Sequence, residues 1–170
     1  MKLDSEIDEV EGRLRVLREK QPELNRGVKA QVRKLCELLK ALPISETVAD
    51  PALCVEARSR GREGLLAYLA LVVEGENKTV YLVYRDAEGN DVEKKELPTA
   101  PIADLVEAAK IVDDFIGLVQ ETVERERLKE LEDEYARAVE FAEACVSAYK
   151  AYEGACRRLQ NVLQHEEGSH

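Results

Sequence analysis

Apolar residues recur at alternating steps of three and four in two long segments, one toward each end of the chain. We name these stripes the first seam and the second seam. The first seam comprises Leu3, Ile7, Val10, Leu14, Leu17, Gln21, Leu24, Val28, Gln31, Leu35, Leu38 and Leu42. The second seam comprises Leu128, Leu131, Tyr135, Ala138, Ala142, Cys145, Tyr149, Tyr152, Cys156, Leu159 and Leu163. No seam position is charged, so both segments are predicted to be coiled-coil helices.

The first helix is predicted to end before Pro43, because proline cannot continue a helix. Pro22 and Gly27 interrupt its pattern, and Pro22 removes one helical hydrogen bond, so a kink or a short break is expected there. Asp50 followed by Pro51 reads as the start of a second, short helix that reaches about Ala57.

Three strand candidates follow, at residues 65–73, 78–85 and 91–97. The first is an apolar run, the second is rich in Val and Tyr, and the third is charged enough for an edge strand. Turn-forming residues separate them, which predicts a three-stranded antiparallel meander.

Residues 102–164 then show a helical pattern without proline. Within it, the apolar stripe from Leu105 to Val123 is followed by a step of five to Leu128, and this step rotates the apolar face by about 100°. We therefore expect residues 103–123 to cover the sheet and residues 128–163 to pair with the first helix.

Charge order predicts that this pairing is antiparallel. Residues 1–42 hold ten basic and eight acidic groups, whereas residues 103–170 hold eight basic and sixteen acidic groups. In the antiparallel arrangement, the basic residues between 26 and 40 face the acidic residues between 130 and 140. The predicted fold is thus α+β: a long antiparallel coiled coil of the N- and C-terminal helices, flanking a small three-stranded antiparallel β-meander covered by a helix.

The predicted domains follow from these elements. Residues 1–42 and 124–165 form a coiled-coil stalk, and residues 43–123 form a small α+β module. Residues 166–170 are expected to be a disordered tail, because Gly168-Ser169-His170 resembles the start of an appended tag.

The net charge of −10 disfavours direct binding to nucleic acid, whose phosphates would be repelled. No apolar run approaches the roughly 20 residues that span a bilayer, and the N-terminus has no signal-peptide core. The four cysteines lack CxxC spacing, which is typical of reduced thiols, so a cytoplasmic protein is expected.

The sequence offers little catalytic chemistry. Both histidines, His165 and His170, lie among the last six residues of the sequence, and we find no phosphate-binding loop and no dinucleotide fingerprint. We therefore expect a protein that is not an enzyme and holds no metal or cofactor.

The best local candidate for a partner site is a small basic cluster next to the predicted edge strand. An edge strand has unpaired backbone groups that a partner strand can complete, and arginines add complementarity for an acidic partner. Lysines at an edge also block strand addition, which counts against this interpretation. The candidate residues are Arg58, Arg60, Arg62, Val92, Lys94 and Lys95.

Three functions remain open. The leading one is a non-enzymatic interaction protein, namely an adaptor, assembly factor or inhibitor. The order of helix, hairpins and helix resembles the layout of prefoldin subunits, although the glycine-containing hairpin motifs of that family are absent; the resemblance implies a holdase chaperone. The acidic charge leaves an inhibitor that mimics DNA as a third possibility.

Apolar residues beside the seams predict a homodimer; they are Val16, Leu39, Val139, Phe141 and Val146.

Overall fold

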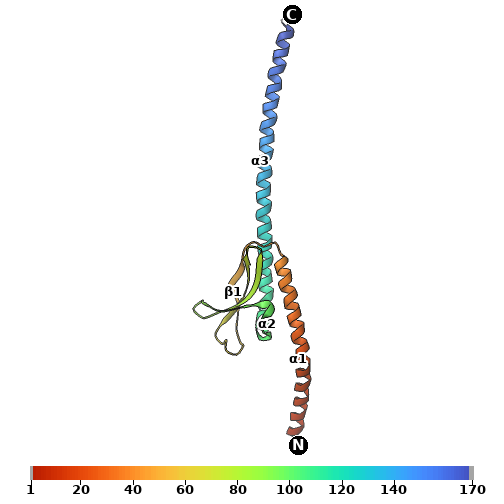
Figure 1. Cartoon of the computed structure of the whole chain (residues 1–170), viewed down its shortest axis with the longest axis vertical. Helices are drawn as coiled ribbons and strands as arrows, with labels where there is room; N and C mark the ends of the chain where they lie inside the picture. The colour runs from red at the N-terminus through yellow and green to blue at the C-terminus, as the bar shows by residue number, and fades with distance from the viewer. Residues whose placement is uncertain (1, 169–170) are drawn as a thin grey trace. The chain divides into compact units, whose positions relative to one another are not determined.

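The computed structural model describes residues 2–168. The chain divides after Val123 into an N-terminal unit and a C-terminal unit, which are described separately below. The elements, labelled in Figure 1, are the helices α1 (Lys2–Ala41), α2 (Ile102–Ala109) and α3 (Val112–Gly168), the strands β1 (Val48–Glu56), β2 (Leu66–Glu74), β3 (Asn77–Arg85) and β4 (Asp91–Glu96), and the short 3-10 helix η1 (Leu97–Thr99).

The sheet is an antiparallel meander in the order β1-β2-β3-β4. Strands β2 and β3 pair along their whole length, from Leu66 opposite Arg85 to Glu74 opposite Asn77. Gly75 joins them with a φ of 63°, a left-handed conformation that favours glycine. The antiparallel arrangement agrees with the sequence prediction, but the predicted three-stranded meander is not confirmed, because the sheet has four strands.

The fourth strand, β1, lies where the sequence indicated a short helix, and that prediction was wrong. The Asp50 carboxylate accepts a hydrogen bond from the Ala52 backbone N–H at 3.0 Å, as a helix N-cap would. Ala49 pairs with Ala70 before this turn, and Cys54 pairs with Tyr68 after it. Asp50 and Pro51 therefore begin a bulge in an edge strand, where a proline costs no ladder hydrogen bond.

The core lies between the sheet and helices on one of its faces (Figure 1). The sheet contributes Leu71, Leu82 and other buried side chains, and the second half of α1 contributes Cys36 and Leu39. Leu39, predicted to remain available beside the first seam, is only 3% exposed. The second half of α1 is therefore part of the N-terminal unit.

The predicted covering helix, residues 103–123, is two helices. Lys110 and Ile111 form a turn between α2 and α3, in which the Ile111 N–H donates to the Ala108 carbonyl at 3.1 Å. Together with Leu105, Ala108 and Phe115, Ile111 is buried in the core. The tighter turn keeps these side chains on one face.

The helix α1 is continuous through Pro22, where the sequence predicted a kink or a short break.

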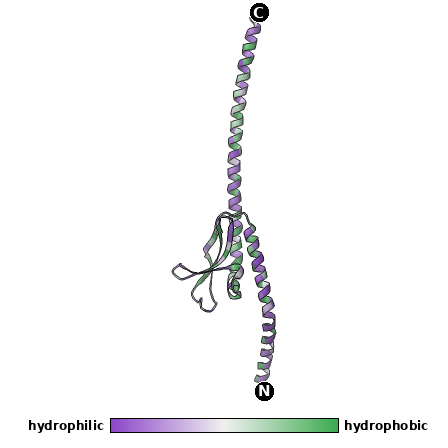
Figure 2. Cartoon of the chain, viewed as in Figure 1, coloured by the Kyte–Doolittle hydropathy of each residue, from purple (hydrophilic) through white to green (hydrophobic). Residues whose placement is uncertain are grey.

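The C-terminal unit consists of the remainder of α3, which is helical to Gly168. Residues 166–168, predicted to be disordered, belong to this helix, whereas 169–170 lie outside the described residues. No residue from 124 to 168 is buried. Figure 2 shows hydrophobic positions recurring among hydrophilic ones along this helix. Among residues 2–168, no helix is both long and apolar enough to cross a membrane.

Candidate interaction surfaces

A buried ion network joins the sheet to α2. Asp104 of α2 is fully buried, and its carboxylate accepts hydrogen bonds from the Arg62 guanidinium at 2.5 Å, the Tyr84 hydroxyl at 2.6 Å and the Lys95 ammonium at 3.2 Å. Arg62 also binds both carboxylate oxygens of Glu93, at 2.9 and 3.0 Å. A buried carboxylate needs such partners, because removing a charge from water is costly.

The electrostatics of the network agree with this geometry. Burial, followed by the hydrogen bond to Asp104, raises the pKa of Tyr84. The guanidinium of Arg62 lies 4.5 Å from the centre of the Tyr84 ring. Its hydrogen bonds to Glu93 lower the pKa of that carboxyl. The charged forms of Arg62 and Glu93 and the neutral form of Tyr84 are therefore the stable ones, which fixes β3, β4 and α2 together.

A second carboxylate of α2 holds the loop before β2. Glu107 is 4% exposed and accepts the backbone N–H groups of Arg58 at 2.7 Å and Ser59 at 2.9 Å. Burial by itself would raise the pKa of Glu107, but these hydrogen bonds and Lys110, 3.2 Å away, outweigh it, so the pKa falls below its usual value. The hydrogen bonds to Glu107 therefore hold in place the loop that carries Arg58, Arg60 and Arg62.

The predicted partner residues separate into two groups. Arg62 and Lys95 point inward and bind Glu93 and Asp104, so their charges are already neutralised. The exposed members are Arg58, Arg60, Val92 and Lys94, and Lys94 lies 4.3 Å from the centre of the Tyr81 ring. Strand β4 lies at the edge of the sheet, as predicted. The available surface is therefore smaller than the sequence indicated.

Asp104 and Glu107 were not identified from the sequence. The segment Ile102–Ala109 is apolar except for these two acidic residues, which lie three apart and so on neighbouring positions of one helical face. Acidic residues inside an otherwise apolar helix require buried partners, and this signal could have indicated the network.

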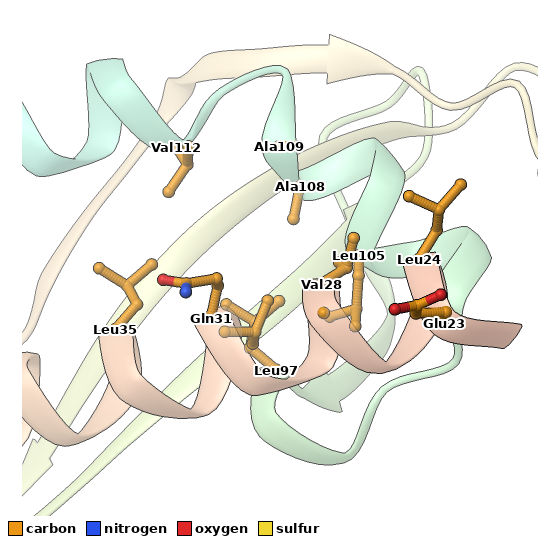
Figure 3. Close-up of a pocket in the computed structure, with 12 residues that line it drawn as sticks. Glu23, Leu24, Val28, Gln31, Leu35, Leu97, Leu105, Ala108, Ala109 and Val112 are labelled. Atoms are coloured by element: carbon orange, nitrogen blue, oxygen red, sulfur yellow. The ribbon is translucent and has the colours of Figure 1, made fainter. Parts of the chain in front are cut away.

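An apolar groove runs between α1 and α2. Its volume is about 570 Å³, and its lining is apolar except at Glu23 and Gln31. From α1 come Leu24, Gly27, Val28, Val32 and Leu35, and from η1, α2 and α3 come Leu97, Leu105, Ala108, Ala109 and Val112. Figure 3 shows side chains of the two walls directed toward each other.

The second seam is exposed along its whole length. Tyr135, Tyr149 and Tyr152 are 72%, 68% and 74% exposed, and the leucines from Leu128 to Leu163 are more than half exposed. Cys145 and Cys156, which belong to this seam, are exposed free thiols. The first seam is similar from Leu3 to Leu24. Neither surface has its apolar side chains covered within its own unit.

No group of three or more His, Cys, Asp or Glu side chains in the described part of the chain is arranged to hold a metal ion.

Comparison with protein family models, with curated proteins and with solved structures finds no match for this chain. The function is therefore inferred from the surfaces themselves.

Proposed function

We propose that this chain is a non-enzymatic protein–protein interaction protein that assembles through antiparallel coiled-coil pairing of its seams. The observation that carries the proposal is the exposure of the second seam, which is apolar at every heptad core position and lies on a helix without a buried residue from 124 to 168.

The energetics favour a partner for this helix. Full burial of one leucine side chain stabilises a protein by about 1.5–3 kcal/mol, and the second seam leaves four leucines at least half exposed. Isolated helices are only marginally stable in water, because most helix stability comes from packing of an apolar face. A helix of this composition therefore gains most of its stability from a second helix.

Matched alanine substitutions test the proposal. Ala138→Glu with Ala142→Glu introduces two charges at seam positions, whereas Ala136→Glu with Ala144→Glu introduces the same charges on the outer face. We expect the seam pair to lower the melting temperature of the helical circular dichroism signal and to dissociate the assembly in light scattering. The outer pair should do neither. Equal behaviour of the two double variants would reject seam pairing.

The β4 edge provides a second surface for a different protein partner. The proposed contact residues are the exposed Arg58, Arg60, Val92 and Lys94. Arg58→Glu with Arg60→Glu should weaken capture of an acidic partner by about tenfold, equivalent to 1.4 kcal/mol. Helicity should be unaffected, since neither side chain belongs to the ion network. Unchanged capture by this variant would place the partner surface elsewhere.

The exposed seams also suit a holdase chaperone, which binds the apolar segments of unfolded proteins. A holdase would suppress aggregation of an unrelated unfolding protein, and the seam pair of glutamates would abolish that effect. An assembly protein whose seams are occupied by partner helices would not suppress aggregation. The same variants therefore distinguish the two functions.

A further inference from the structure

The groove between α1 and α2 is continuous with the exposed part of the first seam. Four of its α1 lining residues, Leu24, Val28, Gln31 and Leu35, are members of that seam. The seam extends from Leu24 to Leu3 with its apolar residues exposed. The shape that covers both surfaces at once is a long helix with an apolar stripe, rather than a compact ligand.

We infer that the groove is the docking site for the second seam of another copy of this chain, in antiparallel orientation. This inference rests on the proposed function and names the partner of the seam. In an antiparallel coiled coil, core positions pair in layers, and the register predicted from the charges pairs Leu35 with Leu131 and Val10 with Cys156.

The side chains fit in this register. In the groove, Leu24 meets Ala142 and Val28 meets Ala138, so large residues meet small ones and the helices can approach closely. The polar seam residue Gln31 meets Tyr135, whose hydroxyl can pair with the amide. The other polar residue of the first seam, Gln21, meets Cys145.

Charge complementarity selects the same arrangement. Residues 26–40 of α1, which overlap the groove lining, carry five basic residues, and residues 130–140 of the docked helix carry five acidic ones. They are Arg26, Lys29, Arg33, Lys34 and Lys40 on α1, and Glu130, Glu132, Asp133, Glu134 and Glu140 on the docked helix. Each exposed pair contributes little to affinity, so these charges mainly set the orientation.

A second copy explains more than the alternatives. The helix α3 runs without a break from Val112 to Gly168, so no loop separates the second seam from residues 112–123. Pairing of two second seams would leave the groove and the first seam exposed. When each copy docks its second seam on the α1 helix of the other, the first and second seams of both copies are covered. Such an isologous contact closes as a dimer.

Gly27 provides a direct test, because it lines the groove and a side chain at this position would meet nothing within 4 Å. Gly12 is equally open and lies on the outer face of the same helix, so it is the matched control. Gly27→Glu places a charge in the groove beside the acidic docked helix. We expect its dimer dissociation constant to rise at least tenfold, whereas that of Gly12→Glu should change less than threefold.

Disulfide formation tests the register. Gln21→Cys should form a disulfide with Cys145 of another copy on mild oxidation, giving a dimer on a non-reducing gel and a linked peptide by mass spectrometry. Glu19→Cys, on the outer face, should not. A link from position 21 to Cys145 within one chain, or links between second seams alone, would overturn the inference.

The outcomes separate this inference from the proposed function. If glutamates at Ala138 and Ala142 dissociate the assembly while Gly27→Glu does not, seam pairing stands and groove docking is wrong. If the wild-type chain has the 19.1 kDa mass of a monomer at high micromolar concentration, a second copy is not the occupant. A dimer that Gly27→Glu weakens and the position 21 disulfide traps supports both.

Discussion

Replacement of Asp104 by alanine should destabilise the N-terminal unit by about 3 kcal/mol, the lower end of the range for breaking a buried ion pair. The variant leaves the Tyr84 hydroxyl buried without its acceptor, since Tyr84 is fully buried. An orphaned buried hydroxyl alone costs about 1–3 kcal/mol. Arg62 keeps both hydrogen bonds to Glu93 and its position over the Tyr84 ring, which limits the loss.

Two further variants divide this cost. Asp104→Asn keeps an acceptor for the Tyr84 hydroxyl but removes the charge that faces Arg62 and Lys95, so about half of the destabilisation should remain. Tyr84→Phe combined with Asp104→Ala removes the orphaned hydroxyl. The double variant should therefore be less destabilised than the sum of the two single variants.

The assay is urea denaturation monitored by hydrogen–deuterium exchange in β2 and β3, because these strands report on the N-terminal unit alone. Asp86→Ala is an unsuitable control, since its carboxylate accepts hydrogen bonds from the turn at Glu88 and Asn90. Glu88→Ala removes an exposed acidic side chain and is the better comparison. A loss below 1 kcal/mol for Asp104→Ala would refute the conclusion that the network stabilises the fold.

Three other predictions follow from local geometry. The pKa of Glu107 is lower in the folded protein than its ordinary value of 4.5. Its stabilising contribution is therefore lost as the pH falls below that value, and Glu107→Gln should flatten the acid limb of a stability–pH curve. Burial raises the pKa of Cys36 to about 11, so a thiol reagent at pH 8 should spare Cys36 in the folded chain and modify the exposed Cys145 and Cys156. These two cysteines should become protected as the protein assembles. Equal labelling of all three cysteines at any protein concentration would contradict this prediction. Pro22→Ala restores a helical N–H and should raise the melting temperature of α1, with a gain of up to about 3 kcal/mol.

Hydrophobic periodicity predicted the long helices and three of the strands because these elements bury or present a regular face. The prediction at β1 rested instead on the capping signal of Asp50 and Pro51, and it failed because the Asp50 side chain forms the same local hydrogen bond in a bulge as it would at a helix start. Local sequence cannot distinguish these outcomes, since pairing of Val48 with Leu71 and of Val55 with Ala67 is a long-range interaction.

The sequence also led to the wrong face for part of the covering segment. The apolar stripe from Leu105 to Val123 was expected to cover the sheet, but Ala109, which belongs to this stripe, is exposed and lines the groove. The buried stripe instead includes Ala108, Ile111 and Phe115, and the turn at Ile111 changes the phase between the two helices. No glycine or proline marks this turn.

The ion network and the proposed docking site are physically connected through α2. Asp104 lies next to Leu105, which forms a wall of the groove, and the same helix carries Ala108 and Ala109. Loosening the network should therefore reduce both the stability of the N-terminal unit and the affinity between copies, whereas Gly27→Glu should reduce affinity alone. If Asp104→Asn lowered stability but left the dimer dissociation constant unchanged, α2 would not form a wall of the occupied site, and the second helix would contact α1 only.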